Sequence, residues 1–176
     1  MSSAEQLSSN AASLSSTKAP LSRYFEMTKP TISLLVVVTA LPAIIMAEPV
    51  ALNFWTLTAI LFGTYLASAS SASFNHIFED EIDAMMVRTK KRPLPSGRVS
   101  KKAALIIATG LGIVSVIILA IAHPLAGAIA LIANIFYAVV YTRFLKPNTS
   151  QNIVIGGAAG AVGPLIGWAG VTGELH

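Results

Sequence analysis

The hydrophobic positions of this chain gather into five long stretches that are separated by short polar segments. They run over residues 31–47, 54–74, 103–122, 124–142 and 152–171, and none contains Lys or Arg. Each is near the ~20 residues that an α-helix needs to cross the hydrocarbon of a bilayer, and none alternates as a barrel strand does. The pattern predicts an all-α fold, a polytopic transmembrane bundle of about five helices.

The fifth stretch carries glycines at spacings of four, three, four and three. These are Gly156, Gly160, Gly163, Gly167 and Gly170. The spacing places all of them on one helical face, and no Lys-Ser or Lys-Thr follows that would indicate a phosphate loop. We therefore expect a face for close helix packing.

The composition also indicates a membrane protein. Hydrophobic residues make up 54% of the 176 residues, charged residues 11%, and the mean hydropathy is +0.69. A soluble domain needs more charge to cover its surface. The Ser- and Ala-rich beginning lacks a continuous apolar core, so we expect residues 1–23 to form a disordered cytoplasmic tail and residues 24–176 a transmembrane domain.

All twelve basic residues fall on one side of the predicted bundle. They are Lys18, Arg23, Lys29, Arg88, Lys90, Lys91, Arg92, Arg98, Lys101, Lys102, Arg143 and Lys146. The positive-inside rule then predicts a cytoplasmic N-terminus and an outward C-terminus. The formal charge of +4 is thus explained by topology, and we expect no nucleic-acid partner.

Four of the eight acidic residues lie between Glu79 and Asp83. The second stretch continues to them without Gly or Pro, so we expect its helix to project beyond the hydrocarbon. At about 100° per residue, Asn75, Glu79 and Asp83 form one stripe along this helix. Oxygen ligands without cysteine favour Mg²⁺ that shares its shell with phosphates. The spacing fits equally well an acidic patch that the following basic loop neutralises.

That loop brings five positive charges next to the acidic stripe. It runs from Arg88 to Arg98, and Pro93 and Pro95 restrict its freedom. Carboxylates that hold a metal, together with Arg side chains that bind phosphate oxygens, would form a receptor for a polyanion. At the membrane surface, such a receptor suits a lipid diphosphate.

These segments resemble those of the UbiA-type intramembrane prenyltransferases. The matching residues are Asn75-His-Ile-Phe-Glu79-Asp-Glu-Ile-Asp83 and Arg88-Thr-Lys-Lys-Arg92-Pro-Leu-Pro-Ser-Gly-Arg98. The middle Glu79, Thr28-Lys29-Pro30, and the run from Gln151 to Gly160 are similar to the haem O synthase branch, the protohaem farnesyltransferases.

The resemblance implies transfer of a farnesyl group from farnesyl diphosphate to a vinyl group of protohaem, at the cytoplasmic face of a bacterial inner membrane. It implies that Asn75, Glu79 and Asp83 hold Mg²⁺ on the diphosphate. The substrate-binding residues would be Lys29, Arg88, Lys91, Arg92 and Tyr141. Tyr141 and Thr142 would form a wall of the diphosphate cavity, although their position at the helix end fits an interfacial anchor equally well. The farnesyl chain and porphyrin would lie in apolar space between the helices.

Three other polar residues have less certain roles. Asn134 lies within the fourth stretch and should either hydrogen bond between helices or line a cavity. His76 and His123 could contact a haem, but the pair His123-Pro124 is more typical of an outer loop.

Members of the resembled family are about twice as long as this chain. We therefore expect it to correspond to their N-terminal half, with activity that depends on a second half. Two alternatives stay open: a related prenyltransferase for a quinone or chlorophyll precursor, and a non-catalytic membrane fragment whose acidic stripe is structural.

Overall fold

A computed structural model describes residues 20–47, 52–145 and 160–175. Within these ranges the chain is helical and has no strand. The elements are α2 (Pro20–Met27), α3 (Pro30–Met46), α4 (Phe54–Met85), α5 (Lys101–Ala122), α6 (Pro124–Ile135), the π-helix η1 (Phe136–Leu145) and α9 (Val162–Thr172). The predicted all-α bundle is confirmed.

Three helical runs are long and apolar enough to cross a membrane: Phe54–Met85, Lys101–Ala122 and Pro124–Thr142. A fourth span is formed if α2 and α3, which meet at a bend of 51°, are taken together. The fifth stretch predicted from the sequence lies partly outside the described residues, and its described part, α9, has 11 residues.

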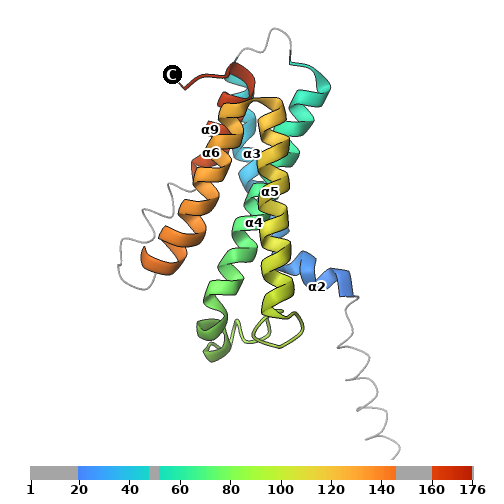
Figure 1. Cartoon of the computed structure of the whole chain (residues 1–176), viewed down its shortest axis with the longest axis vertical. Coiled ribbons are helices and arrows are strands. Elements are labelled where there is room, and N and C mark those ends of the chain that lie inside the picture. Colours follow the sequence, from blue (N-terminus) through green and yellow to red (C-terminus); the bar gives the residue numbers. More distant parts are fainter. Residues whose placement is uncertain (1–19, 48–51, 146–159, 176) are drawn as a thin grey trace, which may run out of the picture.

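The helices pack side by side around α4 (Figure 1). Helix α4 contacts α5 along its length, while α3 packs against both α4 and α9, and α6 packs against α5 and α9. The core between them is made largely of small side chains, with Ala67, Ala126 and Ala130 around Leu119. Small residues allow close approach of helices, which lipid-embedded bundles need because they lack a hydrophobic driving force between helices.

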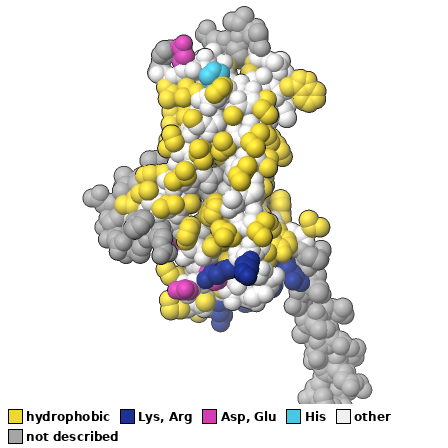
Figure 2. All heavy atoms as spheres, in the orientation of Figure 1, with side chains coloured by type: hydrophobic (Ala, Val, Ile, Leu, Met, Phe, Trp, Pro, Cys, Tyr) yellow, Lys and Arg dark blue, Asp and Glu magenta, His cyan; other side chains and the backbone are white. Residues whose placement is uncertain are grey.

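The apolar and charged side chains are separated along the bundle. Figure 2 shows apolar side chains over the length of the helices and Lys and Arg side chains gathered near one end, at the level of α2. This distribution is expected for a bundle whose sides face hydrocarbon and whose end faces water.

The glycine face of α9 packs directly on α3. A Cβ added at Gly163 would lie 2.7 Å from the carbonyl oxygen of Val36, and one at Gly167 would lie 2.9 Å from that of Ala40. Gly170 is similarly tight against Ile60. The predicted close packing is confirmed at these three positions, whereas Gly160 faces open space and Gly156 lies outside the described residues.

A sharp corner joins α2 to α3 at Lys29. The residue before a proline is disfavoured in the α-helical region, so α2 cannot continue through Pro30. Lys29 instead adopts the left-handed conformation, with φ 45° and ψ 63°, and Pro30 begins α3. Helix α2 corrects one boundary from the sequence, because residues 20–23, assigned to the tail, are helical; residues 1–19 lie outside the described residues.

Candidate functional site

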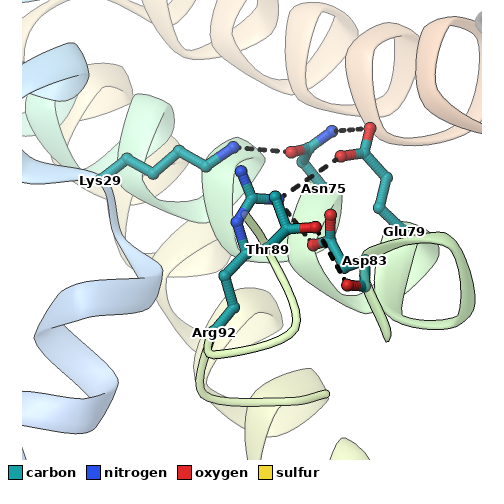
Figure 3. A network of polar contacts seen from close by, with 6 residues as sticks. All are labelled: Lys29, Asn75, Glu79, Asp83, Thr89 and Arg92. Atoms are coloured by element: carbon teal, nitrogen blue, oxygen red, sulfur yellow. Dashed lines mark hydrogen bonds and ion pairs between the residues drawn. The ribbon is translucent and has the colours of Figure 1, made fainter. Parts of the chain in front are cut away.

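The three residues of the predicted stripe lie together on α4 and are buried (Figure 3). Asn75 and Asp83 are each 3% exposed and Glu79 is 9% exposed. The Asn75 amide nitrogen donates to Glu79 Oε1 at 2.7 Å, which links the first two members of the stripe. The amide oxygen of Asn75 therefore faces away from Glu79.

Two cationic side chains from other elements reach this stripe. Lys29 Nζ donates to Asn75 Oδ1 at 2.7 Å. Arg92 Nη1 donates to Asp83 Oδ2 at 2.6 Å and lies 3.9 Å from Glu79 Oε2 (Figure 3). The basic loop thus neutralises the acidic stripe in this structure, which was one of the two interpretations of the sequence.

The other two acidic residues of the cluster point elsewhere. Asp80 pairs with Lys101 at the start of α5, with 3.1 Å between Lys101 Nζ and Asp80 Oδ2. Glu81 is exposed. At about 100° per residue, both lie off the stripe of Asn75, Glu79 and Asp83, in agreement with these contacts.

The basic loop, residues 86–100, is held against α4 by contacts of its own. Pro93, Leu94 and Val99 are buried, and the Thr89 hydroxyl donates to the carbonyl oxygen of Asp83 at 3.0 Å. These anchors place Arg92 beside Asp83. Pro93 and Pro95, which were expected to restrict the loop, both belong to this compact segment, and of the two only Pro93 is buried.

Arg98 connects the same loop to α2. Its guanidinium lies 3.4 Å from Glu26 Oε2 and also donates to the backbone carbonyl of Lys91 and to the Ser96 hydroxyl. Arg98 is therefore committed to structural contacts, which leaves Arg88 and Arg92 as the arginines of this loop that face the stripe.

A polar cavity of about 590 Å³ opens beside the stripe. Its lining residues are Lys29, Asn75, Phe78, Glu79, Ile82, Asp83, Met86, Arg88, Thr89, Arg92, Tyr137 and Thr142. Six of the eight residues predicted from the sequence are among them. Thr89 and Tyr137 were missed, and no signal in the sequence distinguished them from neighbouring loop and helix residues.

Two predicted substrate-binding residues do not line this cavity. The side chain of Lys91 is exposed, and its backbone carbonyl accepts a hydrogen bond from Arg98. Tyr141 stacks on Tyr137, with ring centroids 5.0 Å apart, and leaves the wall to Tyr137 and Thr142. The cause is the π-helix η1, whose wider turn brings Thr142 over Tyr137, so that the Thr142 hydroxyl donates to the Tyr137 carbonyl at 2.8 Å.

An apolar cavity of about 500 Å³ adjoins the polar one. It is lined by residues of α3, α4, α6, η1 and α9, among them Ala67, Ala130 and Ile166. Lys29 and Tyr137 line both cavities, so a molecule with an anionic head and an apolar chain has space for each part on either side of these two residues.

Comparisons with known proteins agree with this arrangement. The model of the UbiA prenyltransferase family matches residues 36–176. The chain belongs to this family. It is 47% identical over 154 residues to "Protoheme IX farnesyltransferase 1" of Shewanella putrefaciens, covering 87% of this chain and 51% of that protein. It is 46% identical over 157 residues to "Protoheme IX farnesyltransferase" of Nitrosococcus oceani, covering 87% and 52%.

The chain spans about half the length of the curated relatives it matches. A solved structure described as digeranylgeranylglyceryl phosphate synthase is similar in fold, with a TM-score of 0.77 and 20% identity over 86% of this chain and 53% of that one. These matches establish a UbiA-type helical membrane fold for this chain.

The stripe of this UbiA family member has the donor chemistry for a hard cation. It offers amide and carboxylate oxygens, and Mg²⁺ takes such ligands while sharing its shell with phosphates and water. Among the described residues, no group of three or more His, Cys, Asp or Glu side chains is arranged to hold a metal.

The remaining polar residues have defined places. Asn134 donates to the carbonyl oxygen of Ala67 at 3.2 Å and lines the apolar cavity, so both roles expected for it apply. His123 caps α6 by accepting from the backbone nitrogen of Leu125 at 3.2 Å. His76 is 3% exposed and belongs to neither cavity wall.

Proposed function

We propose that this chain carries the diphosphate-binding part of a protohaem farnesyltransferase, which transfers farnesyl from farnesyl diphosphate to a vinyl group of protohaem to give haem O. One observation carries the proposal: a cationic and carboxylate-lined cavity adjoins an apolar cavity, with Lys29 and Tyr137 in both walls. The similarity to relatives named protoheme IX farnesyltransferase supports the choice of farnesyl and protohaem over a quinone precursor.

The residues of the polar cavity suit the departure of diphosphate. As the bond between the allylic carbon and the diphosphate oxygen breaks, negative charge accumulates on the leaving group. Lys29, Arg88 and Arg92 line the cavity and would stabilise this charge through charge-assisted hydrogen bonds. The vinyl π electrons then form the new carbon–carbon bond to the allylic carbon. Water adds to the resulting cation and releases a proton to solvent, which leaves a hydroxyl group.

UbiA prenyltransferases generally use Mg²⁺ for diphosphate binding. In this chain Asn75, Glu79 and Asp83 would hold it, and the ion would neutralise part of the diphosphate charge. For the stripe to do so, Lys29 and Arg92 would turn from the stripe to the phosphate oxygens. The carboxylates and the cations of the site would thus exchange partners when substrate binds.

The orientation follows from charge. By the positive-inside rule, the basic residues beside the polar cavity support a cytoplasmic position for that end of the bundle, in the inner membrane of a bacterium. Farnesyl diphosphate would then enter from the cytoplasmic side, and its chain would lie in the apolar cavity between the helices.

Binding of a farnesyl thiodiphosphate to the chain in membranes tests the proposal. The titration is run with and without Mg²⁺ on the unaltered chain, on Asp83→Ala, and on Glu81→Ala as a matched acidic control outside the cavity. We expect binding that requires Mg²⁺ and Asp83 and that Glu81→Ala leaves unchanged. Binding that ignores both Mg²⁺ and Asp83 would show that the stripe is structural.

The acceptor is tested separately, on a protein of the length of the relatives that contains this chain. We expect it to convert protohaem and farnesyl diphosphate to haem O. A product with a quinone precursor but none with protohaem would assign the site to another UbiA activity.

A further inference from the structure

Helix α2 presents an apolar stripe that is not used in the bundle. Leu21 is 82% exposed and Phe25 is 58% exposed, and the two lie one helical turn apart. Within the described part of the chain, no residue covers either side chain substantially. The two side chains form a small exposed apolar surface on α2.

The opposite side of α2 is fixed to the protein. Met27 is fully buried and packs with Leu94 and Val99 of the basic loop. At about 100° per residue, Met27 lies roughly 200° around the helix from Phe25. Glu26 faces the loop and pairs with Arg98. These contacts fix the rotation of α2, so the stripe of Leu21 and Phe25 points away from the bundle.

The corner at Lys29 determines the direction of α2. Because Lys29 is left-handed and Pro30 begins α3, the two helices meet at 51°. Helix α2 therefore diverges from the bundle at the end where the basic side chains gather (Figures 1 and 2). It lies near the end of the bundle that carries the basic side chains (Figures 1 and 2), and a charged end of this kind is expected where lipid headgroups meet hydrocarbon.

We propose that α2 is an interfacial helix, which lies in the headgroup region of the leaflet on the side of the polar cavity and inserts Leu21 and Phe25 among the acyl chains. The occupant of the stripe is phospholipid. Apolar side chains on one face of a helix, basic residues nearby and a position at the charged end of the spans are the features of a membrane-surface helix.

The position of α2 in the leaflet also fixes the position of Lys29, a residue of the site. Lys29 follows α2 directly, and its Nζ contacts Asn75 Oδ1 at 2.7 Å. A helix that is held on one side by Met27 and on the other by lipid fixes this corner at the mouth of the polar cavity. The inference itself rests on the exposed stripe and the membrane spans, and it holds whichever substrate the cavity binds.

Spin labels test the proposal directly, because the chain has no cysteine and each label site is therefore unique. Phe25→Cys and Leu21→Cys variants are labelled in vesicles of phosphatidylethanolamine and phosphatidylglycerol, and collisions with oxygen and with a water-soluble nickel chelate are compared. Ile113→Cys, exposed in the middle of α5, serves as the lipid control, and Glu81→Cys as the water control.

We expect an oxygen-to-nickel collision ratio several-fold higher at positions 21 and 25 than at 81, and a depth shallower than at 113. Three results would overturn the proposal. A ratio equal to that at 81 would place α2 in water. Spin–spin broadening would show a second copy on the stripe. A label shielded from both reagents would show that another segment of protein covers it.

Discussion

Arg92 Nη1 donates to Asp83 Oδ2 at 2.6 Å, so the basic loop itself occupies the carboxylate that the proposed metal requires. Asp83 is 3% exposed, and a buried carboxylate is strongly disfavoured without a partner. Arg92 supplies that partner. Metal and guanidinium should therefore compete for Asp83, and diphosphate should relieve the competition by offering Arg92 its own oxygens.

This competition predicts opposite effects of Arg92→Gln on two ligands. Affinity for Mn²⁺ alone, measured by electron paramagnetic resonance, should rise at least about fivefold, because removing a neighbouring unit charge is worth about 1 kcal/mol or more at such distances. Affinity for inorganic diphosphate with Mg²⁺ should fall. Lys90→Gln, an exposed loop residue outside the cavity, should change neither. A fall in both affinities would show that Arg92 only maintains the loop.

Lys29 combines a strained backbone with a site contact, and two substitutions separate these. Ala at position 29 keeps the unfavourable φ of 45°, whereas Gly adopts it freely. Lys29→Gly should therefore be more stable than Lys29→Ala by about 1 kcal/mol. Thermal unfolding in detergent, followed by circular dichroism, measures this difference.

Both Lys29 variants should bind diphosphate less tightly than the unaltered chain, because the contact of Nζ with the cavity is lost in each. Equal stability of the two variants would show that the backbone at position 29 is not strained. Undiminished diphosphate binding would show that the Lys29 side chain does not contribute to binding. The two outcomes are independent of each other.

The acidic stripe was predictable because one α-helix carries it without interruption. Asn75, Glu79 and Asp83 follow the period of an α-helix, and α4 continues through them to Met85. The cations that meet the stripe were predictable as types, since Lys29, Arg88 and Arg92 lie at the same end of the bundle.

The cavity lining differs from the set of residues predicted from the sequence where backbone geometry departs from the α-helix or depends on distant contacts. In the π-helix η1, Tyr137 takes the place expected for Tyr141 in the cavity wall, whereas Thr142 lies in the wall as expected. Lys91 is exposed because the path of the loop depends on the pairing of Arg98 with Glu26, 72 residues away in the sequence. Periodicity carries no information about either.

The spacing of apolar residues also indicates helix α2. Leu21 and Phe25 are four residues apart, and Tyr24 and Met27 three, which gives two apolar sides to an eight-residue helix that ends before Lys29-Pro30. The low charge and high Ser content of the preceding residues instead indicate a disordered tail, to which residues 20–23 were assigned.

The contact between α9 and α3 predicts a clear difference between two glycines. An added methyl group at Gly163 would clash with the Val36 backbone, which cannot move without shifting α3, whereas at Gly160 it would meet open space. Gly163→Ala should lower stability by about 1–3 kcal/mol, as overpacking typically does. Gly160→Ala should not lower it, and unfolding in detergent compares them. Equal loss at both positions would contradict the packing.

If the farnesyl chain lies in the apolar cavity, filling that cavity should weaken binding of the prenyl chain and leave binding of the diphosphate headgroup unchanged. Ala133 lines this cavity but not the polar one, so Ala133→Phe should fill space needed by the farnesyl chain. Affinity for farnesyl thiodiphosphate should fall at least about tenfold, since several methylene groups lose burial at ~0.8 kcal/mol each, while affinity for inorganic diphosphate stays unchanged.

Ile135→Phe is the matched control for this change, because Ile135 is 54% exposed and lines neither cavity. It should leave both affinities as they are. If Ala133→Phe weakens inorganic diphosphate and farnesyl thiodiphosphate equally, the substitution has disturbed η1 and its Tyr137 rather than filled the cavity. If it weakens neither, the farnesyl chain lies elsewhere, along the lipid-facing side of the helices.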